Sequence, residues 1–311
     1  DAEMPIVGTA LRGDAQRTRH LIDAIRHAGG GYKPRIVFTS SIAVFGAPFP
    51  DKIGDEFLSA TLTSYVTQKA IGELLEVGGL VAGYGPAQVL FGVELTLGEG
   101  EVVALMGRNG AGKSTTLKTL MGMVAERQGR IEFMGHDLSR AEPHAVARLG
   151  LGYVPEDRRV FSDLTVLENL EVGRQGARRW PDGSAAPAWT PEALFRLFPN
   201  LGEMPQRPGA RMSGGEQQML TVARTLMGNP YLVLLDEPSE GVAPLIVEQM
   251  AQMIIALKQQ GVSILLCEQN MHFAELVSDR AYVLEKGQIR YQATMAELSA
   301  NDEVRRAYLS V

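Results

Sequence analysis

A lysine and a serine stand at the end of a glycine-rich segment whose spacing, G-x-x-x-x-G-K-S, is typical of loops that bind phosphate. Glycines let successive backbone N–H groups turn toward phosphate oxygens, and a helix that begins there adds the positive end of its dipole. Lys113 would reach the β- and γ-phosphates of a nucleotide, and the Ser114 hydroxyl would bind Mg²⁺. The whole segment comprises Gly107, Arg108, Asn109, Gly110, Ala111, Gly112, Lys113, Ser114 and Thr115.

The flanking residues separate this interpretation from a chance glycine turn that happens to hold a lysine. The apolar run 102–106 precedes the loop and predicts a buried strand, and residues 116–123 carry a helical pattern. Strand, glycine turn and helix in this order form the context in which the motif binds phosphate. We therefore predict that the phosphates of a nucleotide and Mg²⁺ bind at this loop, and the family resemblance given below implies that the nucleotide is ATP.

Two adjacent carboxylates follow a second apolar run. Residues 232–235 are all apolar and predict a strand buried within a parallel sheet, and Asp236 and Glu237 come directly after them. Asp236 would hold Mg²⁺ through water, and Glu237 would be the general base for the attacking water. Neighbouring residues on a strand point to opposite sides, so the two carboxylates can have different roles. The alternative is a strand that ends in a charged turn without chemistry.

Composition limits the class of protein. The chain has 311 residues, a formal net charge of −6 and a pI near 5.5, which argues against a general nucleic-acid binder because a basic face is expected there. A single cysteine, Cys267, cannot form an internal disulfide and is expected to be a buried apolar residue. No apolar run is long enough to cross a bilayer, so a role at a membrane would require a partner.

From residue 80 to its C-terminus the chain resembles the ATP-binding subunit of ABC transporters. The likeness rests on the loop and strand above, and on Met212-Ser213-Gly214-Gly215-Glu216-Gln217-Gln218, which is similar to the family's signature motif. The resemblance implies that Tyr84 stacks on adenine, although a tyrosine in an ordinary turn is the alternative. It also implies that a second subunit's ATP is bound through its γ-phosphate by Ser213, Gly214, Gly215 and Glu216. Ser213 is in addition a good N-cap for a following helix.

Two departures from the general family pattern match its branched-chain amino-acid branch. Glu156 stands where most members have a Mg²⁺-contacting glutamine, and its carboxylate could still bind the metal. Gln269 stands where most members have a switch histidine; its amide can donate a hydrogen bond to the γ-phosphate but cannot titrate. Arg158 and Arg159 form either a coupling surface for a permease or a solvated charged loop.

Residues 1–76 carry a separate and shorter resemblance, to the middle of an extended short-chain dehydrogenase/epimerase. A strand over 35–39 and a helix over 64–76 are expected, and by resemblance Ser41, Tyr65 and Lys69 match that family's catalytic residues. The glycine-rich dinucleotide fingerprint that should precede them is absent. We therefore expect an inactive fragment, joined near residue 77 to the ATP-binding domain, 77–311.

The sequence thus predicts an α/β fold: a P-loop NTPase of ABC type, preceded by an incomplete Rossmann-like fragment. A parallel core sheet, a small antiparallel subdomain near 80–103 and a helical subdomain from about 160 to 220 are expected. The resemblance implies an ATPase that powers import and binds at the cytoplasmic face of the inner membrane. Its implied partners are a second ATPase subunit, two membrane permeases and, indirectly, a solute-binding protein outside the cytoplasm. An oxidoreductase built on residues 1–76 and a non-transport ABC protein are the alternatives.

Overall fold

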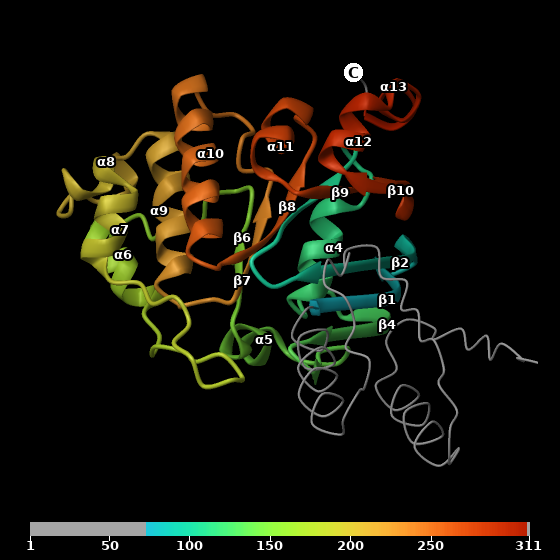
Figure 1. Ribbon diagram of the computed structural model, residues 1–311. Coiled ribbons are helices and arrows are strands. Elements are labelled where there is room, and N and C mark those ends of the chain that lie inside the picture. The colour runs from blue at the N-terminus through green and yellow to red at the C-terminus, as the bar shows by residue number, and fades with distance from the viewer. Residues whose placement is uncertain (1–72, 310–311) are drawn as a thin grey trace, which may run out of the picture. The chain divides into compact units, whose positions relative to one another are not determined.

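The computed structural model describes residues 73–309, which form two sheets and the helices around them (Figure 1). The larger sheet has six strands in the order β10-β9-β3-β8-β7-β6. All neighbours in it pair in parallel except β9 and β10, which are antiparallel. The strands are β3 (Val102–Met106), β6 (Leu151–Val154), β7 (Leu232–Asp236), β8 (Ser263–Glu268), β9 (Arg280–Glu285) and β10 (Gln288–Thr294). Every residue of β3, β7 and β8 is buried, as the apolar runs 102–106 and 232–235 predicted for the first two.

The smaller sheet is antiparallel, and it draws on more of the chain than residues 80–103. Its order is β2-β1-β4-β5, with β1 (Glu73–Tyr84), β2 (Ala87–Gly98), β4 (Glu126–Phe133) and β5 (His136–Asp137). The helix expected over 64–76 is wrong for residues 73–76, which form the start of β1. Leu75 pairs with both Leu97 and Phe133 and is fully buried. Residues 73–76 are therefore a strand because they pair with two neighbouring strands, β2 and β4.

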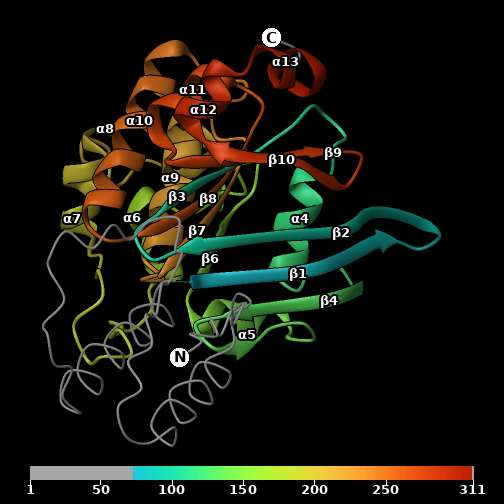
Figure 2. The ribbon, with the colours of Figure 1, turned by 45° about the vertical axis from the view of Figure 1, so that its right-hand side comes forward.

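Helices cover the core sheet and form a lobe of their own. The helices α6 to α9 and the 3₁₀ turn η2 lie within 166–226, which confirms the helical subdomain. They gather beyond the β6 edge of the core sheet and away from the antiparallel sheet (Figure 2). The helical elements are α4 (Lys113–Leu120), α5 (Pro143–Leu149), α6 (Val166–Gly173), α7 (Pro191–Leu197), α8 (Pro199–Gly202), η2 (Gly209–Arg211), α9 (Gly214–Leu226), α10 (Pro244–Gln259), α11 (Met271–Val277), α12 (Met295–Ala300), α13 (Asp302–Val304) and the π-helical turn η3 (Arg305–Leu309).

Apolar packing joins the two sheets through α4. Leu117 and Leu120 on α4 are fully buried in one cluster with Leu90 of β2 and Leu105 of β3. A second buried cluster lies among α6, α9, α10 and alternate residues of β7 and β8, on the face of the sheet opposite to the first cluster. The helix that follows the glycine loop is therefore held between the two sheets, which fixes the loop in front of it.

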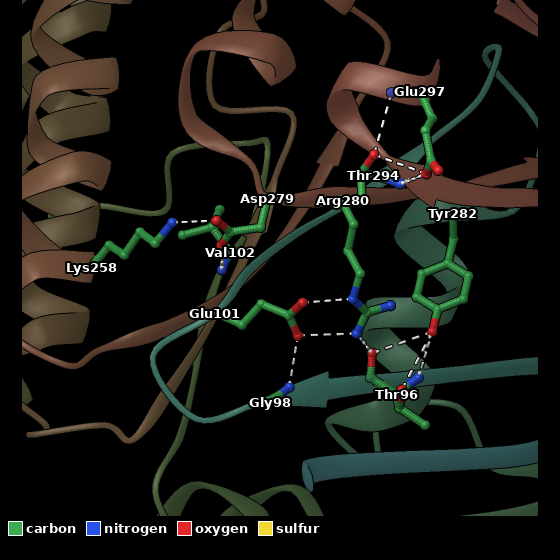
Figure 3. Close-up of polar contacts among 10 residues, drawn as sticks. All are labelled: Thr96, Gly98, Glu101, Val102, Lys258, Asp279, Arg280, Tyr282, Thr294 and Glu297. Atoms are coloured by element: carbon green, nitrogen blue, oxygen red, sulfur yellow. Dashed lines mark hydrogen bonds and ion pairs between the residues drawn. The ribbon is translucent and has the colours of Figure 1, made fainter. Parts of the chain in front are cut away.

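A polar network also fixes the antiparallel sheet to the core sheet (Figure 3). Arg280, the first residue of β9, donates to the Glu101 carboxylate at 2.6 Å and to the Thr96 carbonyl at 2.6 Å. Glu101 in turn accepts a hydrogen bond from the Gly98 N–H at 2.8 Å. The turn between β2 and β3 is thus bonded to the core sheet at the start of the strand that leads into the glycine loop.

Candidate nucleotide-binding and hydrolysis site

The glycine loop lies between β3 and α4, in the context that the sequence predicts. Two of its glycines are required by the backbone. A side chain at Gly107 would place its Cβ 2.4 Å from the Leu284 carbonyl oxygen, and Gly112, the N-cap of α4, has φ +110°. An L-residue with a side chain rarely adopts that second conformation. The loop's shape therefore depends on glycine at both ends.

Lys113 is folded into this loop. Its side chain is 3% exposed, and its ammonium donates to the Gly107 carbonyl at 2.8 Å and to the Arg108 carbonyl at 3.2 Å. It also forms an ion pair with the Glu237 carboxylate at 2.9 Å. Lys113 thus supplies a buried positive charge at the loop, and such a charge suits an anionic ligand such as phosphate.

Asp236 lies at the end of β7 and has both carboxylate oxygens bonded. Ser114 Oγ donates to Oδ1 at 2.9 Å, and the Tyr153 hydroxyl donates to Oδ2 at 3.0 Å. Burial raises the pKa of Asp236, and these two hydrogen bonds oppose that rise. The structure therefore brings two of the three sequence-predicted metal residues, Ser114 and Asp236, into direct contact.

Glu237 faces different groups from those that bind Asp236. Its backbone has φ +47°, so the chain turns directly after β7. One carboxylate oxygen pairs with Lys113, and the other accepts from the Gln269 amide at 3.3 Å. The same amide donates to Glu240 at 3.3 Å. Burial acts to raise the pKa of Glu237, but hydrogen bonds with Glu240 and Lys113 hold it below the ordinary value.

Glu240 forms a carboxyl pair with Glu237 that gives the protein a pH-dependent stability. The hydrogen bond it shares with Glu237, together with burial and charge repulsion, raises the pKa of Glu240 to about 7. Because the pKa is higher in the folded state, the folded protein binds the Glu240 proton more tightly than the unfolded chain does. This contribution to the free energy of unfolding is fully present below pH ~4.5 and is lost as the pH rises through ~7. In Glu240→Gln the melting temperature of the nucleotide-free protein should fall less between about pH 5 and pH 8 than in the wild type.

Thermal unfolding across this pH range tests the assignment. Glu248→Gln makes the same chemical change at an exposed site on α10 and should keep the wild-type slope. Parallel curves for the wild type and Glu240→Gln would show that the carboxyl pair does not titrate in this range.

Other sequence-predicted residues lie outside this cluster. Tyr84 is at the tip of the β1–β2 hairpin and is 50% exposed. Ser213 caps α9 in a capping box: its Oγ accepts from the Glu216 N–H at 3.4 Å, and Glu216 accepts from the Ser213 N–H at 2.7 Å. Among residues 73–309, neither Tyr84, Glu156 nor the Ser213–Glu216 segment shares a hydrogen bond with the glycine loop. The dehydrogenase-like residues Ser41, Tyr65 and Lys69 lie outside the described residues.

Three residues of the site were missed by reasoning from the sequence: Tyr153, Glu240 and Glu268. Glu268 is buried at the end of β8, where it accepts hydrogen bonds from the backbone of Ser239, Gln269 and Asn270 at 3.0–3.2 Å. It therefore fixes the turn that presents Gln269. An acidic residue directly after the apolar run 264–267 was the signal for Glu268. No spacing rule indicated Tyr153 or Glu240.

The described residues set limits on metal and membrane binding. Within 73–309, no three His, Cys, Asp or Glu side chains come together as a metal site. None of the helices in this range has the length and apolar character needed to span a bilayer. Ser114 and Asp236 alone would give a metal too few ligands, so phosphate and water oxygens would have to complete its shell.

Comparison with known proteins agrees with this geometry. The family model for ABC transporters matches residues 90–240. The chain is 44% identical to the high-affinity branched-chain amino acid transport ATP-binding protein BraG of Pseudomonas aeruginosa, and the alignment covers 73% of this chain and 95% of the BraG sequence. The lipopolysaccharide export system ATP-binding protein LptB of Haemophilus influenzae is 33% identical over 76% of this chain and 97% of its own. The crystal structure of a nucleotide-free ATP-binding cassette from an ABC transporter aligns with a TM-score of 0.62 and 26% identity, covering 75% of this chain and 97% of that one. The chain therefore belongs to the ATP-binding proteins of ABC transporters, a family of ATP-hydrolysing subunits.

Proposed function

We propose that this chain is the ATP-hydrolysing subunit of an importer for branched-chain amino acids or similar small solutes. The observation that carries the proposal is the 44% identity with BraG across nearly all of that relative's length. Glu156 and Gln269, which match the same branch, support it. The 33% identity with LptB favours an exporter's ATPase as the second candidate.

The site's own residues suit ATP hydrolysis. The loop N–H groups and Lys113 would hold the phosphates, and Tyr84 would stack on adenine. Ser114 and Asp236 would hold Mg²⁺, with Glu156 as a further ligand, and the ion would neutralise charge on the phosphates. Glu237 would take a proton from the attacking water, because its carboxylate is kept ionised beside Lys113. Gln269 would orient Glu237 and donate to the γ-phosphate.

The same site would be completed by a second subunit. ABC ATPase subunits generally dimerise and act with membrane permeases. In this proposal the exposed N-terminus of α9, with Ser213, Gly214, Gly215 and Glu216, binds ATP held by the loop of the other copy. The dimer would sit at the cytoplasmic face of the inner membrane on two permeases, which receive solute from an extracytoplasmic binding protein.

Transport by the reconstituted complex tests the proposal. The chain should copurify from membranes with permease subunits, and vesicles containing that complex and its binding protein should accumulate radiolabelled leucine only with ATP. A Glu237→Gln complex of equal composition is the control and should accumulate none. Association with a lipopolysaccharide-binding membrane complex instead, without leucine uptake, would contradict import and favour the second candidate.

A further inference from the structure

We infer that Tyr153 positions the Asp236 carboxylate for metal binding and thereby sets the affinity of the site for a divalent cation. The inference rests on the proposed Mg²⁺–ATP site. Its basis is a three-residue arrangement in which Ser114 donates to one oxygen of Asp236 at 2.9 Å and Tyr153 donates to the other at 3.0 Å. Tyr153 comes from β6, a different strand from those that carry the loop and the two catalytic-site carboxylates.

The register of the core sheet explains how Tyr153 reaches Asp236. Strand β6 pairs in parallel with β7, and Tyr153 lies opposite Leu234, two residues before Asp236. The side chain therefore spans from the outer strand of the sheet to the carboxyl end of β7. The Tyr153 carbonyl also accepts a hydrogen bond from Thr225 on α9 at 3.5 Å, so β6 is held between β7 and that helix.

The hydroxyl of Tyr153 is a fixed donor. Burial and the neighbouring Asp236 raise the pKa of Tyr153 far above its usual value, so the phenol keeps its proton. With Ser114 on Oδ1 and Tyr153 on Oδ2, the two donors fix the plane of the Asp236 carboxylate. Each Asp236 oxygen and the Ser114 oxygen keep lone pairs that a cation or its water could use.

Removing this one hydroxyl should loosen the carboxylate without removing any metal ligand. In Tyr153→Phe the ring remains, but Oδ2 loses its donor, so the carboxylate can rotate out of the plane in which Ser114 and Tyr153 hold it. Loss of a group that orients a metal ligand typically lowers metal affinity about 10- to 100-fold. ATP binding in the absence of divalent cation should stay unchanged, because the loop and Lys113 are untouched.

The experiment uses the full chain with ATP and Mn²⁺ as the spectroscopic probe. Mn²⁺ binding is followed by electron paramagnetic resonance, and ATP affinity in excess chelator is measured by calorimetry. Tyr282→Phe is the matched control: it removes a hydroxyl bonded to the Thr96 N–H at 3.0 Å, away from Asp236. Asp236→Asn removes the metal-binding carboxylate itself. Melting curves set a temperature at which all four proteins are folded.

We expect Mn²⁺ affinity to fall about tenfold or more in Tyr153→Phe, to fall further in Asp236→Asn and to stay at the wild-type value in Tyr282→Phe. Unchanged Mn²⁺ affinity in Tyr153→Phe alone would overturn the inference but leave the proposed site intact. If Tyr282→Phe lost Mn²⁺ affinity equally, the effect would be a general structural one and the inference would be overturned. Weaker ATP binding by Tyr153→Phe in excess chelator would overturn the inference in the same way. Unchanged affinity in Asp236→Asn would overturn the metal site itself.

Discussion

Replacing Glu237 with glutamine is expected to slow ATP hydrolysis by about 10²- to 10⁴-fold while ATP remains bound. The amide has the shape of the carboxylate but cannot accept a proton from water. The carboxylate lies 2.9 Å from the Lys113 ammonium and 3.3 Å from the Gln269 amide, so it is ionised and oriented. Phosphate release measures turnover, and calorimetry measures retained ATP.

The control for this variant is Glu248→Gln, the same change at an exposed position of α10. It should hydrolyse ATP at the wild-type rate and bind ATP equally well. If Glu237→Gln also retained most of the wild-type rate, another group would have to be the base. Loss of ATP binding in Glu237→Gln would indicate instead that the ion pair with Lys113 supports the loop.

The parts of the fold that could be predicted from sequence are those specified by local pattern. The apolar runs 102–106 and 232–235 form the fully buried strands β3 and β7. A continuous apolar run predicts such a strand because parallel strands covered on both faces have no solvent-facing positions for polar residues. Ser213 caps α9 through its own side chain, which again is a local interaction. The strand–loop–helix order around Lys113 follows from the same short-range rules.

What could not be predicted depends on pairing between distant segments. Residues 73–76 were expected to end a helix, yet they form part of β1 because β2 and β4 offer partners on both sides. Strand β4 lies more than forty residues after β1, so no local signal links them. Tyr153 reaches Asp236 only because β6 is placed next to β7. Glu240 meets Glu237 only because the chain turns at φ +47°.

Changing Ser213 to arginine should prevent two copies from closing on ATP. Ser213 is the N-cap of α9, with its side-chain oxygen at the helix N-terminus. Within residues 73–309, the Ser213–Glu216 segment shares no hydrogen bond with the glycine loop of its own chain. In a sandwich of two copies it would lie against the other copy's γ-phosphate. A long cationic side chain there would occupy the place of the phosphate and remove the cap. We expect association to weaken by on the order of 2–4 kcal/mol, or about 30- to 1,000-fold.

Sedimentation of the Glu237→Gln protein with Mg²⁺ and ATP tests the central claim most directly, because slow turnover would trap the closed state. The account predicts a dimer with ATP, a monomer without it and a monomer for Glu237→Gln combined with Ser213→Arg. Ser184→Arg in the same background adds the same charge at an exposed loop serine and should still dimerise. A Glu237→Gln protein that stays monomeric with ATP, or a Ser213→Arg combination that dimerises normally, would contradict the account.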